Sequence, residues 1–84
     1  MYNESMSVIF TKHLRIKLEQ RRINKAFVLE TIKNPDLVKP TYGFREELYR
    51  KFSKLFMKVI VLKKRNGHII VLTAHWVAKA KNKL

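Results

Sequence analysis

Eighty-four residues are enough for one small domain and too few for two, so we expect a single domain over residues 1–84 with frayed tails at 1–6 and 78–84. Nineteen Lys and Arg residues against six Asp and Glu residues give a formal net charge of +13, while 46% of the residues are hydrophobic. This balance argues against a disordered chain, and the lack of cysteine excludes disulfides and thiolate metal sites.

The first half of the chain predicts one strand followed by two helices. Residues 8–10 are β-branched and aromatic, and Thr11 behind them can cap a helix over residues 12–22 through its hydroxyl. Asn24 can cap a second helix, which ends at Asn34-Pro35-Asp36 because proline removes a backbone donor and disfavours helix at the preceding residue.

The second half predicts a loop at residues 37–45, with a short extended piece, and then three strands. The strands are rich in Val, Ile, Phe and Tyr and span residues 48–52, 56–64 and 68–76. Asn66-Gly67 is a strong hairpin signal, because both central residues of a type I′ turn need positive φ. The order predicts an α+β domain, with two N-terminal helices on one face of an antiparallel sheet of about four strands.

The predicted turns decide which side chains share a face. With Asn66-Gly67 as a two-residue loop, Lys58 lies opposite His75, and a loop at Ser53-Lys54 places Tyr49 opposite Lys58. The helix-facing side then consists of Leu48, Phe52, Met57, Val59, Val61, Ile70, Leu72, Ala74 and Trp76. Nearer the turn, the same register pairs Val61 with Leu72 and Leu62 with Val71.

A row of three polar side chains crosses the other face, with cross-strand neighbours about 5 Å apart. Tyr49, Lys58 and His75 each suit an ordinary solvated strand. However, all three lie beside Thr73 on one face of a protein of charge +13. A functional site is therefore about as good an explanation as an ordinary solvated surface.

Metal-free RNA cleavage needs a base for the 2′-hydroxyl, cations for the phosphorane and an acid for the leaving oxygen. His75 can serve as base or acid, and a cation beside a histidine lowers its pKa by favouring the neutral form. Lys58 and Lys51 can stabilise the phosphorane, while Arg21 can clamp the phosphate. Tyr49 can stack on a base or donate a proton. We expect no metal and no other cofactor.

Several short motifs resemble a widespread family of small bacterial and archaeal domains of unknown function. The motifs are Phe10-Thr-Lys-His13, Arg21-Arg-Ile23, Asn34-Pro35-Asp36, Tyr49-Arg-Lys51, Lys58-Val-Ile-Val61 and Val71-Leu-Thr73-Ala-His75-Trp76, over most of residues 8–77. Those domains look like distant relatives of RelE-type toxin ribonucleases. The resemblance implies a RelE-like sheet, a toxin role and an acidic antitoxin partner encoded nearby.

The family pattern also implies site residues, with matches at His13, Arg21, Lys51, Lys58 and Thr73. The chain departs from it twice. Arg22 stands where the family usually has glycine, so the turn there needs another backbone solution, and His75 stands where an aromatic residue is common. Away from this pattern, a phosphate-binding surface is expected from the remaining basic residues Arg15, Lys17, Arg22, Lys25 and Arg50.

The net charge predicts an anionic partner, with RNA or a ribosome ahead of an acidic protein and a membrane last. The longest apolar run, residues 69–72, is far shorter than a membrane span, and residues 1–10 lack the features of a signal peptide, so we expect a soluble cytoplasmic protein. Three functions stay open. They are a metal-independent endonuclease of toxin–antitoxin type that cuts mRNA with or without the ribosome, a non-catalytic RNA- or ribosome-binding module, and a protein-interaction domain with an apolar patch of Ile60, Leu62 and Val71.

Overall fold

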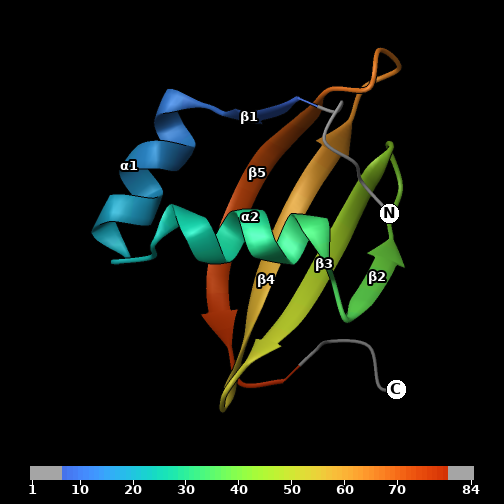
Figure 1. The fold of residues 1–84 in the computed structure, drawn as a ribbon. Coiled ribbons are helices and arrows are strands. Elements are labelled where there is room, and N and C mark those ends of the chain that lie inside the picture. Colours follow the sequence, from blue (N-terminus) through green and yellow to red (C-terminus); the bar gives the residue numbers. More distant parts are fainter. Residues whose placement is uncertain (1–6, 80–84) are drawn as a thin grey trace.

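The chain runs through one strand, two helices and then four strands. The computed structural model describes residues 7–79. Its elements are β1 (Val8–Phe10), α1 (Lys12–Gln20), α2 (Lys25–Lys33), β2 (Leu37–Pro40), β3 (Arg45–Phe52), β4 (Leu55–Lys63) and β5 (Ile69–Val77). The predicted α+β class is confirmed, with α2 lying across the front of β3 and β4 and α1 packed beside β5 (Figure 1).

The sheet is larger and more mixed than the sequence predicted. Its order is β1-β5-β4-β3-β2, in which β1 runs parallel to β5 and the other neighbours are antiparallel. The fifth strand, β2, lies in the segment expected to be mainly loop. Asp36 starts it, because its N–H donates to the Tyr49 carbonyl at 2.7 Å and its Oδ2 accepts from the Lys51 N–H at 2.8 Å.

Both helices begin where the sequence predicts. The Thr11 hydroxyl oxygen accepts from the Leu14 N–H at 3.1 Å, and Asn24 Oδ1 accepts from the Ala26 N–H at 2.8 Å. Each cap satisfies a donor that the first turn leaves without a helical partner.

The end of α1 comes two residues before the predicted one, at a turn built on Arg22. Arg22 adopts φ 56°, and its N–H donates to the Glu19 carbonyl at 3.1 Å. The Ile23 N–H donates to the Leu18 carbonyl at 2.9 Å, which completes a Schellman motif. Arginine thus occupies the left-handed position where glycine is usual.

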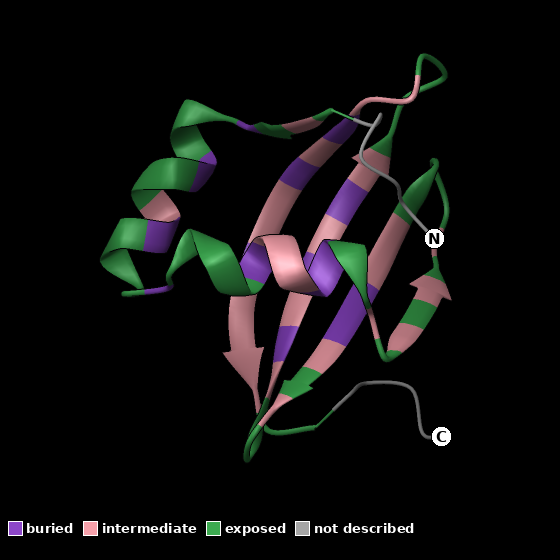
Figure 2. Ribbon diagram, viewed as in Figure 1, coloured by how far each residue is buried: buried purple, intermediate pink, exposed green. Residues whose placement is uncertain are grey.

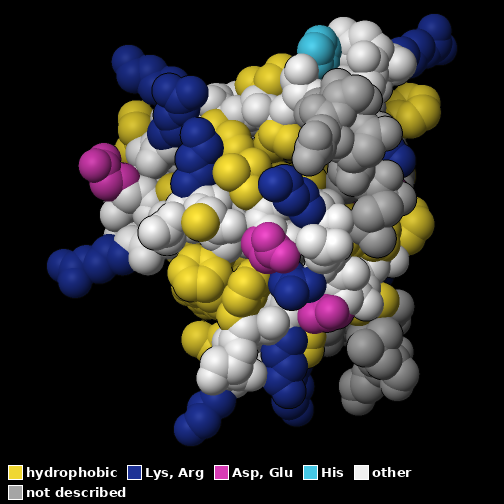
Figure 3. Space-filling view, in the orientation of Figure 1, with side chains coloured by type: hydrophobic (Ala, Val, Ile, Leu, Met, Phe, Trp, Pro, Cys, Tyr) yellow, Lys and Arg dark blue, Asp and Glu magenta, His cyan; other side chains and the backbone are white. Residues whose placement is uncertain are grey.

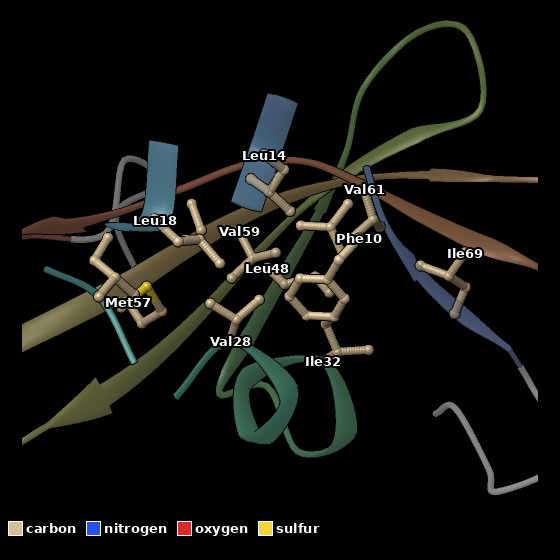
Figure 4. Packing of buried hydrophobic residues seen from close by; sticks show 13 residues of the cluster. Phe10, Leu14, Leu18, Val28, Ile32, Leu48, Met57, Val59, Val61 and Ile69 are labelled. Atoms are coloured by element: carbon tan, nitrogen blue, oxygen red, sulfur yellow. The ribbon is translucent and has the colours of Figure 1, made fainter. Parts of the chain in front are cut away.

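The hydrophobic core lies between the helices and one face of the sheet. Figure 2 shows the buried residues on the inner sides of the helices and on β3, β4 and β5, and Figure 4 shows how they pack. The core consists of Phe10, Leu14, Leu18, Ile23, Val28, Ile32, Leu48, Met57, Val59, Val61, Ile69, Val71 and Ala74. Phe27 of α2 extends it by edge-to-face contacts with Phe52 and Trp76, at ring-centroid distances of 4.9 and 5.3 Å.

The hairpin between β4 and β5 differs from the predicted two-residue type I′ turn. Lys64 pairs with His68, and Gly67 has φ +87° and donates its N–H to the Lys64 carbonyl at 3.1 Å. The loop therefore has three residues, and only its last one is left-handed. Asn66 is not among the positive-φ residues.

A β-bulge at Leu72 reverses the shift that the longer loop introduces. Val61 pairs with Val71 and Leu62 with Ile70, so the predicted pairs Val61–Leu72 and Leu62–Val71 are wrong. Beyond the bulge, Ile60 pairs with Thr73 as predicted, and all later pairs agree.

The bulge also changes which residues face the helices. Ile69 and Val71 are buried in the core, whereas Ile70 and Leu72, predicted to be there, are only half-buried. Val71 is fully buried and so cannot belong to the exposed apolar patch that was expected. Ile60 and Leu62 of that patch do lie on the face away from the helices, half-buried.

Candidate functional site

The predicted row of three side chains is confirmed on the sheet face that no helix of residues 7–79 covers. We call this the open face. Tyr49 of β3 pairs with Lys58 of β4, and Lys58 pairs with His75 of β5. The two-residue loop at Ser53-Lys54 fixes the first pairing, with Ser53 at φ 64°. Since Met57 and Trp76 point to the helices, their neighbours Lys58 and His75 must point away from them.

Glu47, which was not among the predicted site residues, joins this row. The Tyr49 hydroxyl donates to Glu47 Oε1 at 2.8 Å, and Lys58 Nζ lies 4.0 Å from the same oxygen. Only 12% of the Lys58 side chain is exposed. Strand alternation was the available signal, because Glu47 and Tyr49 are two residues apart and therefore share a face.

Tyr49 has a different place from the one expected. Its residue exposure is 0%, and Lys58 Nζ lies 5.9 Å from the centre of its ring. The ring therefore offers no free face to a base, and the expected stacking is wrong. Tyr49 instead orients Glu47 through its hydroxyl, and its ring lies against the Lys58 ammonium group.

Arg21 approaches the row from the helix side of the molecule. β1 pairs with residues 69–71 only, so within the described chain the rest of the outer edge of β5 has no neighbouring strand. Arg21, the C-cap of α1, reaches this edge and donates from Nη1 to the Ala74 carbonyl at 3.0 Å and to the Thr73 hydroxyl at 3.4 Å. Its guanidinium thereby lies beside His75 and Thr73.

His75 is half-buried between two cations. Burial, first, and then the charges of Lys58 and Arg21 lower its pKa from the usual 6.5. The direction is the one predicted from Lys58, although burial is the larger cause and Arg21 adds to it. At neutral pH the imidazole is therefore neutral and able to accept a proton.

Two further predicted residues lie at different distances from this centre. Lys51 is exposed and follows Tyr49 by two residues on β3, so it belongs to the same face. His13 is exposed in the first turn of α1, about 12 Å along the helix axis from Arg21 at 1.5 Å per residue. The structure thus groups Lys51 with the row and leaves His13 at the other end of the helix.

The predicted phosphate-binding residues divide into two places. Arg15 and Lys17 lie on α1, Arg22 lies in the turn after it and Lys25 begins α2, and we call these four residues the α1 basic surface. Lys25 Nζ is 4.7 Å from the centre of the Phe10 ring. Figure 3 shows Lys and Arg side chains spread over this side of the molecule.

Arg50 lies apart from that surface. Like its pairing partner Met57, it is on the helix-facing side of the sheet. Its Nη1 donates to the Asn34 carbonyl at 2.6 Å, and its Nη2 is 3.8 Å from Glu30 Oε2. Arg50 therefore holds the end of α2 against β3.

Within residues 7–79, no group of three or more His, Asp or Glu side chains is placed to hold a metal ion. In the same residues, no helix is both long and apolar enough to cross a membrane. Comparisons with protein-family models, curated proteins and solved structures found no match to the chain.

Proposed function

We propose that this protein is a metal-independent endoribonuclease that works at the Lys58–His75 pair. The observation that supports this best is the neutral, half-buried His75 between Lys58 and Arg21. A proton acceptor between two cations suits a phosphodiester whose neighbouring hydroxyl must lose a proton while negative charge grows on the phosphate.

In the proposed reaction, His75 takes the proton of a 2′-hydroxyl as the 2′-oxygen attacks the adjacent phosphorus. The bond from phosphorus to the 5′-oxygen breaks, which gives a 2′,3′-cyclic phosphate and a free 5′-hydroxyl. The leaving oxygen takes a proton from water, and His75 returns its own to solvent. Lys58 and Lys51 stabilise the phosphorane, and Arg21 clamps a phosphate oxygen from the edge of β5.

Two charge arrangements support these roles. Glu47 lies 4.0 Å from Lys58 Nζ, so it holds the ammonium group on the open face. The Arg21 hydrogen bond to the Ala74 carbonyl fixes the guanidinium beside His75 while other N–H groups of the fork remain available for a phosphate. The cationic groups are thus placed before RNA arrives.

Cleavage of a labelled single-stranded RNA by the purified protein tests the proposal, with and without ribosomes and with EDTA present. His75→Ala should lower the rate about a hundredfold or more, because the general base is lost. His68→Ala is the matched control, since His68 lies on the turn side of β5. RNA that stays uncut under conditions where it binds, with and without ribosomes, contradicts the enzyme and leaves a binding module.

We further propose, from the sequence resemblance, that this nuclease acts as the toxin of a toxin–antitoxin pair with an acidic antitoxin. Induced expression should then arrest growth, and the double variant His75→Ala with Lys58→Gln should not. Growth arrest by both proteins at equal levels contradicts a toxicity that depends on cleavage.

A further inference from the structure

Two aromatic side chains project from the turn between β2 and β3. Tyr42 is 88% exposed and Phe44 is 79% exposed, far more than the other exposed large hydrophobic residues of the described chain, which reach 43% at most. Exposed rings are costly to hydrate, so two together at a strand turn indicate a contact surface. We call residues 41–44 the aromatic tip.

The backbone of the aromatic tip is strained but firmly held. Gly43 has φ +73° and Phe44 has φ +62°, a left-handed conformation that bulky residues rarely adopt. The Thr41 N–H donates to the Arg45 carbonyl at 3.0 Å, and the Phe44 carbonyl accepts from the Lys63 N–H at 3.0 Å. Strain held by surrounding hydrogen bonds is typical of binding sites. Here it keeps the Phe44 ring outward.

Basic residues surround the aromatic tip. A hollow of about 410 Å³ lies between Phe44 and the β4–β5 hairpin and includes Lys64 and Arg65 in its wall. A second hollow of about 280 Å³ at Phe44 includes Arg45, Glu46 and Lys63 in its wall, and Glu46 is paired there with Lys63 at 3.6 Å. Cationic side chains thus line both hollows that border Phe44.

We propose that the aromatic tip and the β4–β5 hairpin bind single-stranded RNA. Bases stack on Tyr42 and Phe44, while Lys64, Arg65 and Arg45 contact the phosphates. This inference rests on the proposed RNA ligand, but it does not require cleavage.

Several features favour RNA over other anionic partners. Single-stranded RNA carries both planar bases and phosphates, and the tip places two exposed rings next to cationic side chains. A membrane-inserting tip needs a continuous apolar surface, whereas Thr41, Gly43 and Arg45 interrupt this one.

The aromatic tip is placed to bind nucleotides that flank the cleaved bond. Lys63, which bonds to the tip, lies five residues from Lys58 along β4, or about 17 Å at 3.3 Å per residue. At roughly 3.4 Å per stacked nucleotide, this distance corresponds to about five nucleotides. Ile60 and Leu62 lie between them on the open face, so RNA can follow β4 from His75 to Phe44.

Binding of a fluorescent single-stranded 12-nucleotide RNA tests the proposal, in a His75→Ala background that prevents cleavage. Tyr42→Ala combined with Phe44→Ala should weaken binding about tenfold or more, as expected for the loss of base stacking. Leu55→Ala is the matched control, because Leu55 is 43% exposed but lies at the opposite end of β4. Circular dichroism checks that each variant is folded.

A second measurement locates the contact directly. RNA that carries 5-iodouracil should crosslink to Tyr42 or Phe44 on irradiation, as identified by mass spectrometry of the peptides. Unchanged affinity of the double variant, or crosslinks confined to other residues, overturns the proposal. The proposal is also overturned if the wild-type protein binds phosphatidylglycerol vesicles but not RNA, and the double variant no longer binds the vesicles. Failure of cleavage alone is a separate result, because the binding assay uses a protein that cannot cleave.

Discussion

At the scale of single residues, Arg22 carries the clearest conflict between sequence and backbone. A side chain with a Cβ in the left-handed region costs roughly 1–2 kcal/mol, and Arg22 adopts φ 56° in the Schellman motif that ends α1. Such a cost is tolerated where a residue has another role. If the α1 basic surface binds RNA, phosphate binding by the Arg22 guanidinium explains why arginine stands here in place of glycine.

Arg22→Gly should therefore stabilise the protein. The left-handed strain disappears, and the gain is reduced by the greater freedom of glycine in the unfolded chain, for a net of about 0.5–1 kcal/mol. Urea denaturation measures the free energy of unfolding. A variant that is less stable than the wild type would show that the Arg22 side chain itself stabilises the fold. If the α1 basic surface binds RNA, the same variant should bind RNA more weakly despite its higher stability.

His75 makes the proposed activity dependent on pH in a definite direction. Its pKa is below 6.5, so the fraction of neutral base, and with it kcat/KM, should rise with pH with a midpoint below pH 6.5. Lys58→Gln removes one cation and should raise this pKa, although burial and Arg21 still lower it. An NMR titration of the His75 ring measures both proteins. An equal or lower pKa in the variant contradicts the electrostatic assignment.

The same shift affects stability. Because the folded protein binds a proton on His75 less readily than the unfolded chain, the free energy of unfolding should fall as pH drops from 6.5 through the folded pKa. Well above pH 6.5 the imidazole is neutral in both states, so this dependence vanishes there. Urea denaturation of the wild type and of His75→Gln across this range isolates the contribution of His75.

At the scale of the elements, the β4–β5 hairpin shows how a turn and a bulge act together. The three-residue loop moves the pairing by one residue, and Leu72 restores it before Thr73. Without the bulge, Lys58 would not face His75. The candidate site therefore depends on the bulge at Leu72, which lies four residues past His68, or about 13 Å at 3.3 Å per residue.

Gly67 is the residue on which this loop depends. It has φ +87°, yet a Cβ added there would meet no atom within 4 Å. Gly67→Ala should hence destabilise the protein through backbone strain alone, by about 1 kcal/mol. Thermal denaturation measures the loss, with Lys64→Ala as a control on the same exposed turn. Equal melting temperatures for Gly67→Ala and the wild type contradict this account.

The sequence predicted those elements whose signals are local. The caps at Thr11 and Asn24 mark the helix starts, and the turn at Ser53-Lys54 aligns Tyr49 with Lys58. β2 was harder to predict, since four residues that include a proline carry little strand signal. This segment becomes a strand because it pairs with β3, and such pairing depends on the whole sheet.

The candidate site was predictable to a similar extent. Lys58 and His75 follow from register, because every side chain in a strand has its face fixed by one pairing. The burial of Tyr49 and the hydrogen bond that it gives to Glu47 depend on packing across three strands. The exposure of Tyr42 and Phe44 depends on loop geometry. Neither property is visible in residue order.

At the scale of the whole molecule, the charge is unevenly compensated. Glu30, Glu46 and Glu47 each lie within 4.0 Å of a basic side chain, and all three pairs involve β3 or its neighbour β4. Since each pair is neutral, the whole net charge of +13 belongs to the remaining residues. The α1 basic surface is the part expected to contact RNA phosphates, which release bound counterions when lysine or arginine neutralises them.

RNA affinity should consequently fall steeply with salt, and the α1 basic surface should account for a defined part of the slope. Each phosphate contact contributes about 0.7 to the log–log slope for a single strand, so replacing Arg15, Lys17 and Arg22 with Gln should reduce its magnitude by about 2. The control variant replaces the exposed residues Lys33, Lys54 and Lys79 with Gln, which removes the same number of charges. If the slope depends on total charge alone, both variants will lower it equally, and a specific phosphate-binding role for α1 is contradicted. A slope reduced only in the first variant locates the RNA backbone on α1, the helix whose C-cap holds Arg21 against β5 beside His75.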